Sequence, residues 1–120
     1  KLPSNRQALM CLPGIGDYVA DAILSFAFDV PAAVVDTNTV RVAGRYLGFS
    51  SGGEARRRRT VIDSVRGLVG TERTRDMNFA VLDLGALVCR AKEPVCERCP
   101  VRARCVQAAP EEKIEGPRTA

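Results

Sequence analysis

Apolar residues recur along most of the chain at the three- and four-residue spacing that is typical of an amphipathic helix. The four stripes are Val19, Ala22, Ile23, Phe26 and Ala27; Val40, Ala43 and Leu47; Val61, Ile62, Val65, Leu68 and Val69; and Phe79, Leu82, Ala86 and Leu87. Only residues 32–35 have β-like character, and they are too few to form a strand alone. The pattern therefore predicts an all-α domain over residues 1–88, followed by a loop at 89–105 and a polar tail at 106–120.

The composition is that of one globular domain with a mild excess of positive charge. Lysine and arginine number 18 against 14 acidic residues, and the net charge of +4 mildly favours a polyanion as partner. The chain contains no histidine, which excludes Ser-His-Asp and Cys-His catalysis and any histidine-ligated metal. No apolar run approaches the length that spans a bilayer, so we expect no membrane partner.

Four of the five cysteines lie close together in the last third of the chain, at Cys89, Cys96, Cys99 and Cys105. Four thiolates in one short segment can enclose a single metal centre, and a cube of iron and sulfide needs one terminal thiolate for each iron. The Cys-x-x-Cys pair is followed by Pro100, as in ferredoxin-type segments. We therefore predict a [4Fe-4S] cluster at residues 89–105 and a reducing intracellular compartment, the cytoplasm or the nucleoid.

Zinc, disulfide or plain core roles suit these cysteines less well. A zinc ribbon usually has two separated Cys-x-x-Cys pairs, and only Cys96 and Cys99 have that spacing. Disulfides suit a secreted chain, but no apolar signal segment opens this one and the cysteine count is odd. Unligated buried cysteines rarely gather in one basic loop. Cys11 stands apart among apolar residues, and we expect it to be a small core residue.

A glycine-rich turn precedes the first helical stripe, with the sequence Leu12-Pro13-Gly14-Ile15-Gly16. Glycines on both sides of an apolar residue allow a tight turn with exposed backbone N–H groups, and a following helix start favours an anion there. The dinucleotide-binding pattern fits poorly, because its third glycine would fall at Val19 and no strand precedes the turn. A plain helix–turn–helix connection without a ligand stays open.

The most basic segment is the run of four arginines at 56–59. On a helix, four consecutive side chains point in widely different directions, so they cannot all face one DNA backbone. At a helix start they also oppose the helix dipole. We expect a solvated first turn with at most one phosphate contact.

A second motif follows the hairpin, at residues 34–42, and with it the chain resembles the helix–hairpin–helix (HhH-GPD) DNA glycosylases of the endonuclease III superfamily. The matching features run in family order from about Leu9 to Cys105. They are Leu12-Pro13-Gly14-Ile15-Gly16, Val35-Asp36-x-Asn38-x-Val40-Arg41-Val42, Asp83-Leu84-Gly85-Ala86 and the four cysteines. The resemblance implies part of a six-helix barrel, with a helix–hairpin–helix motif at about 9–28, a catalytic segment at 34–47 and a cluster loop.

The resemblance also implies that the hairpin binds a DNA phosphate through backbone amides and that Asp36 is catalytic. Cleavage of an N-glycosidic bond develops oxocarbenium character on the sugar, which a nearby carboxylate stabilises. The target nucleotide must first leave the base stack. Asp36 is also suited to be a helix N-cap that accepts a hydrogen bond from the N–H of Asn38 or Thr39, and the two roles are compatible.

Tyr18 occupies the position at which family members that also cut the DNA backbone carry a lysine. Without that amine the covalent imine route is closed, which implies a monofunctional glycosylase that leaves an abasic site. Tyrosine here, together with residues 45–48, resembles the thymine–guanine mismatch glycosylases, so thymine or uracil opposite guanine is favoured. Residues 83–86 look equally like the adenine glycosylases, which act on adenine opposite guanine or oxidised guanine. Ordinary aromatic packing of Tyr18 stays open.

The implied partner is double-stranded DNA with a mismatched or damaged base, contacted also by Asn38, Arg90 and Lys92. Arg98 and its neighbours in the cluster loop would either contact phosphates or offset the cluster's negative charge. The match covers the second half of the family domain, so the N-terminal remainder of the fold is a further expected partner. Two rival functions are a DNA-binding module without catalysis and a redox sensor whose cluster controls DNA affinity.

Overall fold

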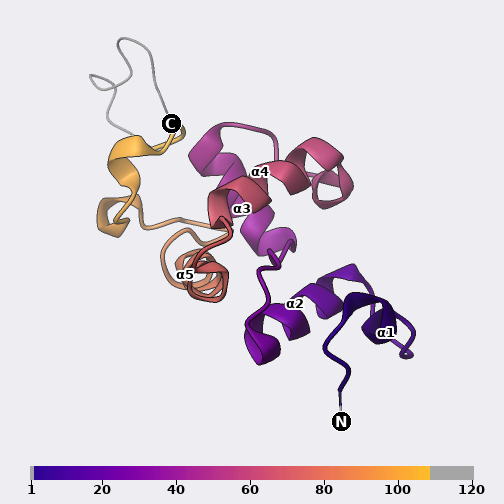
Figure 1. The fold of residues 1–120 in the computed structure, drawn as a ribbon. Coiled ribbons are helices and arrows are strands. Elements are labelled where there is room, and N and C mark those ends of the chain that lie inside the picture. Colours follow the sequence, from indigo (N-terminus) through magenta and orange to yellow (C-terminus); the bar gives the residue numbers. More distant parts are fainter. Residues whose placement is uncertain (1, 109–120) are drawn as a thin grey trace.

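The computed structural model describes residues 2–108, which form helices joined by loops and short turns (Figure 1). The elements are α1 (Arg6–Met10), α2 (Asp17–Phe28), α3 (Thr37–Leu47), η1 (Ala55–Arg57), α4 (Arg59–Val69), α5 (Thr74–Leu87), η2 (Cys96–Arg98) and η3 (Arg102–Arg104). Residues 2–108 contain no β-strand, which confirms the predicted all-α class. None of the described helices has the length and hydropathy needed to cross a bilayer.

Two separate hydrophobic cores hold these helices together. A small core between α1 and α2 contains Leu9, Ala20 and Leu24. A larger core is formed by α3, η1 and α4 and contains Val40, Ala43, Ala55, Val61, Val65 and Val69. The described chain is elongated, 53 × 27 × 26 Å, with α1 and α2 at one end and the C-terminal loop at the other (Figure 1). Helix α5 packs against both α2 and α3 and so connects the two cores.

The predicted inner faces of α3 and α4 agree with the structure. Val40 and Ala43 of α3 are buried, and α4 buries Val61, Val65 and Val69. Gly48 ends α3 at a φ of 91°, a left-handed conformation that favours glycine. Helix α4 buries this one face, whereas α3 also packs against α5 and buries Val42 there.

The apolar stripes of α2 and α5 coincide only in part with what these helices bury. Helix α2 buries Ala20 and Leu24, and Val19 is 37% exposed. Helix α5 buries Asn78 and Val81, and Leu87 is 70% exposed. Both helices are apolar on more than one side, so periodicity alone does not select the side that packs. Of the predicted stripe residues, Ile23 packs against the small core, and Phe26 and Phe79 stack with ring centroids 4.3 Å apart.

Cys11 is exposed, so its predicted place in the core is also wrong. Helix α1 ends at Met10, and Cys11 is its C-cap at the entry to the glycine turn. The core position of this segment belongs to Leu9, which is fully buried.

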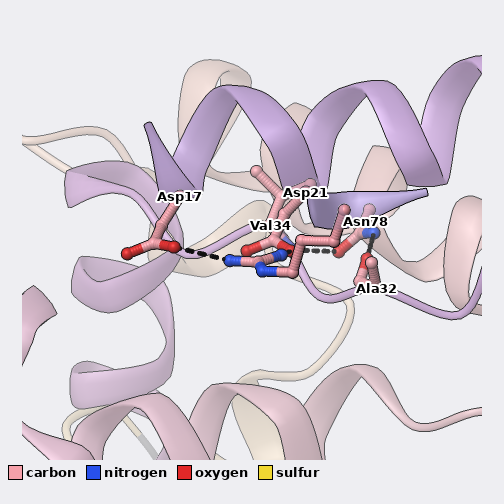
Figure 2. A network of polar contacts seen from close by, with 6 residues as sticks. Asp17, Asp21, Ala32, Val34 and Asn78 are labelled. Atoms are coloured by element: carbon pink, nitrogen blue, oxygen red, sulfur yellow. Dashed lines mark hydrogen bonds and ion pairs between the residues drawn. The ribbon is translucent and has the colours of Figure 1, made fainter. Parts of the chain in front are cut away.

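A buried asparagine, Asn78 on α5, fixes the extended segment that leads into α3. Its Oδ1 accepts a hydrogen bond from the Val34 N–H (3.1 Å), and its Nδ2 donates to the Ala32 carbonyl (2.8 Å) and to Ser25 Oγ (2.8 Å). Figure 2 shows Asn78 with Ala32 and Val34. A buried backbone polar group without a partner is costly, so Asn78 supplies the hydrogen bonds that a neighbouring strand would otherwise provide.

Replacing Asn78 with leucine is expected to lower the free energy of unfolding by about 2–4 kcal/mol, because the Val34 N–H and the Ala32 carbonyl lose their buried partner. Urea denaturation measures this loss. The matched control is Asn5→Leu, which removes the exposed N-cap of α1 and should cost about 1 kcal/mol. An equal or smaller loss for Asn78→Leu would contradict the bridging role.

Candidate DNA interface, active site and metal centre

The glycine turn joins α1 to α2 and leaves its backbone open. The Ile15 N–H donates to the Leu12 carbonyl (3.3 Å), and Gly14 has a φ of +79°, which favours glycine. Gly16 is the N-cap of α2 in an extended conformation. A Cβ built on Gly14 or Gly16 would lie more than 4 Å from every other described atom. The turn therefore leaves the backbone at Gly14 and Gly16 and the start of α2 open to solvent.

A cluster of ion pairs joins α1 to α2, the two helices on either side of the glycine turn. Arg6 of α1 donates hydrogen bonds to Asp21 and to Asp17 (2.7 Å) of α2, whose carboxylates are labelled in Figure 2. Burial raises the pKa of the Asp21 carboxyl although Arg6 opposes this, and the two carboxylates raise the pKa of Arg6. Because desolvation offsets much of the attraction, the cluster fixes the hairpin geometry more than it stabilises the fold.

Asp36 is the N-cap of α3 in a complete capping box. One carboxylate oxygen accepts a hydrogen bond from the Thr39 N–H (2.8 Å), and Thr39 Oγ1 accepts one from the Asp36 N–H (2.9 Å). The N-cap role is thus confirmed with Thr39 as partner. An ionised carboxylate has about four acceptor sites. The capping bond therefore orients the Asp36 carboxylate and leaves other acceptor sites free.

A hollow lies between the first turn of α2 and one face of α4. Tyr18 and Val35, the neighbour of Asp36, both line this hollow, as does Gly16. Tyr18 is 45% exposed, so packing within the described chain does not account for its position. The hairpin and the segment that ends at Asp36 therefore border the same hollow.

The arginine run at 56–59 is fully exposed, as the sequence predicted. Arg57 pairs with Glu54 (3.0 Å), and Arg59 pairs with Asp63 (3.5 Å). Arg56, Arg57 and Arg59 line the far side of the hollow that Tyr18 borders. Their side chains raise the positive charge around it.

The structure brings all four loop cysteines together. Cys89, Cys96, Cys99 and Cys105 are each half-buried and line one cavity. The short turns η2 and η3 return the chain toward this cavity, and the Cys99 N–H donates to the Cys96 carbonyl (3.0 Å). Residues separated by up to 16 positions thus present their thiols to one shared space.

The donor set of this cavity indicates which kind of metal group it could hold. A zinc ion draws its four sulfurs to within about 2.3 Å of one point. Among residues 2–108, no three Cys, Asp or Glu side chains converge closely enough to hold one metal ion. A cluster of four irons separates its four thiolates, each bound to its own iron, and thiolates are the ligands that such clusters take. Four cysteines on one cavity are therefore a donor set of the kind that a [4Fe-4S] cluster takes.

Arg41 of α3 links the predicted catalytic segment to the cysteine loop. Its guanidinium donates to the Gly85 carbonyl (2.8 Å), to the Cys89 carbonyl (3.1 Å) and to Asn38 Oδ1 (2.9 Å). A Cβ on Gly85 would lie 3.3 Å from this guanidinium, so the glycine makes room for it. The sequence motif contains Arg41 but does not indicate this linking role, because contacts across 44 or more residues leave no local signal.

The basic residues of the loop are exposed, as a phosphate contact requires. Arg90 and Lys92 both face solvent, and the Arg90 guanidinium donates to the Glu93 carbonyl (2.9 Å). Arg98, Arg102 and Arg104 are exposed as well. All five cations are thus available to a polyanion.

The loop extends beyond its predicted end. The Val106 N–H donates to the Tyr46 carbonyl (3.0 Å) and the Gln107 N–H donates to the Arg45 carbonyl (3.2 Å). Residues 106 and 107 therefore cap the C-terminus of α3 and do not belong to a free tail. The rest of the predicted tail, residues 109–120, lies outside the described residues.

Sequence and structure comparisons place these features in one group of proteins. No family model matches the chain. The thymine/uracil-DNA glycosylase of Methanothermobacter thermautotrophicus is 35% identical over 105 residues, 88% of this chain and 48% of that protein. The adenine DNA glycosylase of Arabidopsis thaliana is 36% identical over 104 residues, 86% of this chain and 16% of that protein.

Solved structures agree. A thermostable thymine-DNA glycosylase superposes with a TM-score of 0.79 at 34% identity, over 90% of this chain and 50% of that one. Endonuclease III in a covalent intermediate with DNA superposes with a TM-score of 0.71 at 28% identity, over 90% of this chain and 49% of that one. The chain belongs to the endonuclease III superfamily. It spans about half the length of the thymine/uracil relative and of both superposed structures.

Membership of this superfamily confirms the predicted fold. The hairpin, the segment around Asp36 and the cysteine loop occur in the order that the sequence predicted. Phe79 and Leu87 of α5 are exposed in the described chain.

Proposed function

We propose that this chain carries the DNA-binding hairpin and the reacting carboxylate of a DNA glycosylase that removes a mispaired or damaged base. Thymine or uracil opposite guanine is the favoured substrate. The observation that carries the proposal is the orientation of Asp36 by its capping box, directly after Val35, which lines the same hollow as Tyr18 and Gly16. The names of the similar proteins support both the activity and the substrate class.

In the proposed reaction, Asp36 acts on the deoxyribose of a nucleotide that has left the base stack. The bond between C1′ and the base nitrogen breaks with its electron pair leaving on the base, and the sugar gains oxocarbenium character. The Asp36 carboxylate stabilises this positive charge and accepts the proton of the water that adds to C1′. The departing base takes up a proton from solvent and Asp36 later releases the one that it accepted, so the products are the free base and an abasic site.

The proposed enzyme is monofunctional, because Tyr18 offers no amine to attack the sugar. A lysine amine would displace the base and form an imine that borohydride reduces to a stable adduct. We therefore expect no protein–DNA adduct when the complete protein reacts with substrate DNA in the presence of borohydride. An adduct that survives denaturing electrophoresis would refute the monofunctional assignment, and the glycosylase assignment would still stand.

Removal of adenine opposite guanine or oxidised guanine is the second candidate activity. It is favoured by the similarity to adenine DNA glycosylases and by residues 83–86, which look like that branch. Both activities need the same hairpin and the same carboxylate. They differ in the pocket that receives the base, so a comparison of mismatched duplexes separates them.

We propose that the cavity lined by Cys89, Cys96, Cys99 and Cys105 holds a [4Fe-4S] cluster. When bound, the cluster supplies four iron–thiolate bonds that fold the loop. The loop then presents Arg90 and Lys92 to DNA phosphates as fixed positive charges. We also propose that the activity requires the N-terminal remainder of the superfamily fold, which would cover the exposed apolar side of α5.

The hairpin provides a prediction about DNA affinity. Gly16→Ala should weaken binding to all duplexes alike by about 10- to 100-fold, because a methyl group would stand between the backbone amides and a phosphate. Gly16 has a φ of −99°, which alanine adopts without strain, and its Cβ would touch no described atom. Fluorescence anisotropy with several duplex sequences measures the affinity.

The control for this experiment is Gly67→Ala on α4, where an added Cβ also meets no described atom. It should leave DNA affinity unchanged and stabilise the helix by about 0.5–1 kcal/mol. Wild-type affinity in Gly16→Ala, or a loss confined to one duplex sequence, would contradict the role of the hairpin as a phosphate site.

A further inference from the structure

Arg45 lies in the last turn of α3 and borders the cavity that the four cysteines line. It contributes both its side chain and its backbone to the loop. No role for Arg45 follows from the proposed reaction, because Asp36 stands at the opposite end of the same helix. Its contacts therefore serve the loop and not the reacting carboxylate.

The guanidinium of Arg45 contacts the start of the cysteine loop. One terminal nitrogen lies 3.4 Å from Cys89 Sγ and 2.8 Å from the Arg90 carbonyl oxygen. The other donates to the Ala91 carbonyl (3.2 Å). The side chain thus binds three consecutive residues of the loop, beginning with the first cysteine.

The backbone carbonyl of Arg45 contacts the end of the same loop. It accepts hydrogen bonds from Cys105 Sγ (3.4 Å) and from the Gln107 N–H (3.2 Å). One residue therefore touches both the first and the last cysteine, which lie 16 positions apart in the sequence. Arg45 therefore contacts both the start and the end of the cysteine loop.

The two sulfur contacts respond differently when the thiols lose their protons to bind iron. The Cys105 thiol no longer has a proton to donate, so its bond to the carbonyl is lost. The bond from the Arg45 guanidinium to Cys89 becomes a charge-assisted N–H···S bond to a thiolate and strengthens.

Hydrogen bonds to the ligand sulfurs are among the factors that set the potential of an iron–sulfur cluster. A cationic donor withdraws electron density from the sulfur and favours the more reduced, more negative cluster. Arg41 reaches only the carbonyl oxygen of Cys89, and Arg102 donates to the Ala108 carbonyl at 3.5 Å. Arg45 is thus the arginine of this region that contacts a cysteine sulfur in residues 2–108.

We propose that Arg45 is a positioning residue for the iron–sulfur cluster, which holds the first ligand through its bond to Cys89 and the end of the loop through the Gln107 N–H. The bond to Cys89 also raises the reduction potential of the cluster. The proposal rests on the proposed cluster and not on the identity of the excised base. Mutation of a residue that is hydrogen-bonded to a metal ligand typically lowers metal affinity or activity by about 10- to 100-fold.

The test uses the complete protein purified with its cluster, as wild type, Arg45→Gln and Arg45→Lys. Arg104→Gln, at an exposed position of η3, is the matched control. Iron and sulfide content, the midpoint potential in film voltammetry and the rate of cluster loss to a chelator are measured. Arg45→Gln should have a lower potential and lose its cluster about tenfold faster. Arg45→Lys should be intermediate, because lysine keeps the charge but cannot bind sulfur and two carbonyls together.

A potential and a loss rate equal to wild type in both Arg45 variants would overturn the proposal. So would the same changes in Arg104→Gln, because the effect would then belong to loop charge in general. Should Arg45→Gln fail to fold, Arg45→Lys with a wild-type potential and loss rate is sufficient to refute it. A wild-type protein that contains no iron and sulfide would instead refute the proposed cluster, a result that the variants cannot imitate.

Discussion

Replacing Asp36 with asparagine is expected to abolish base release and to leave DNA binding close to that of the wild type. Asparagine caps helices as well as aspartate does, so its amide oxygen can still accept the Thr39 N–H and α3 should begin at the same residue. The substitution removes only the negative charge and the ability to accept a proton. We expect a loss of about 10²- to 10⁴-fold in the single-turnover rate of base excision.

The matched control is Asp63→Asn, which makes the same chemical change at an exposed position of α4. Its excision rate should equal that of the wild type. Electrophoretic mobility shifts report DNA binding for both variants, and the free energy of unfolding confirms that both are folded. Weak DNA binding in Asp36→Asn, with base release reduced only in proportion, would count against a catalytic role and would leave Asp36 as a helix cap.

Replacing Cys99 with serine is expected to remove the cluster and to unfold the loop around it. Within the described part of the loop, η2 and η3 bury no residue, so the loop has little hydrophobic core of its own. Iron and sulfide content and the visible absorbance should fall to background. Limited proteolysis should cut within residues 89–108 in the variant and spare this segment in the wild type.

Cys11→Ser is the control for this experiment. Cys11 is exposed at the end of α1 and does not line the cysteine cavity. It should retain the full iron content and the protease resistance of the wild type. If Cys99→Ser kept its iron and its resistant loop, the assignment of the four ligands would be wrong.

The parts of the fold that could be predicted from the sequence are those that local chemistry determines. The glycine turn, the N-cap at Asp36 and the apolar faces that α3 and α4 turn toward each other follow from backbone conformation, capping and apolar periodicity. The cysteine spacing likewise indicates one shared site, because cysteines in one short loop cannot lie far apart in space.

The parts that could not be predicted depend on contacts between residues far apart in the sequence. Asn78 is buried because it bonds to the backbone of residues 32–34, which no pattern within α5 reveals. The roles of Arg41 and Arg45 depend on carbonyl and sulfur partners 44 or more residues away. The inner faces of α2 and α5 depend on which neighbouring helices are present, and periodicity does not contain that information.

The most direct test of the proposed glycosylase activity is an excision assay of the complete protein on labelled duplexes. The panel contains G·T, G·U, G·A, oxidised G·A and fully matched pairs, each analysed with and without hot alkali. We predict strand cleavage only after alkali, on G·T and G·U and not on matched DNA. Cleavage of the G·A or oxidised G·A duplex instead would reassign the substrate to adenine. No cleavage of any duplex, with DNA binding retained, would contradict the proposed activity and would leave an iron–sulfur DNA-binding module without catalysis.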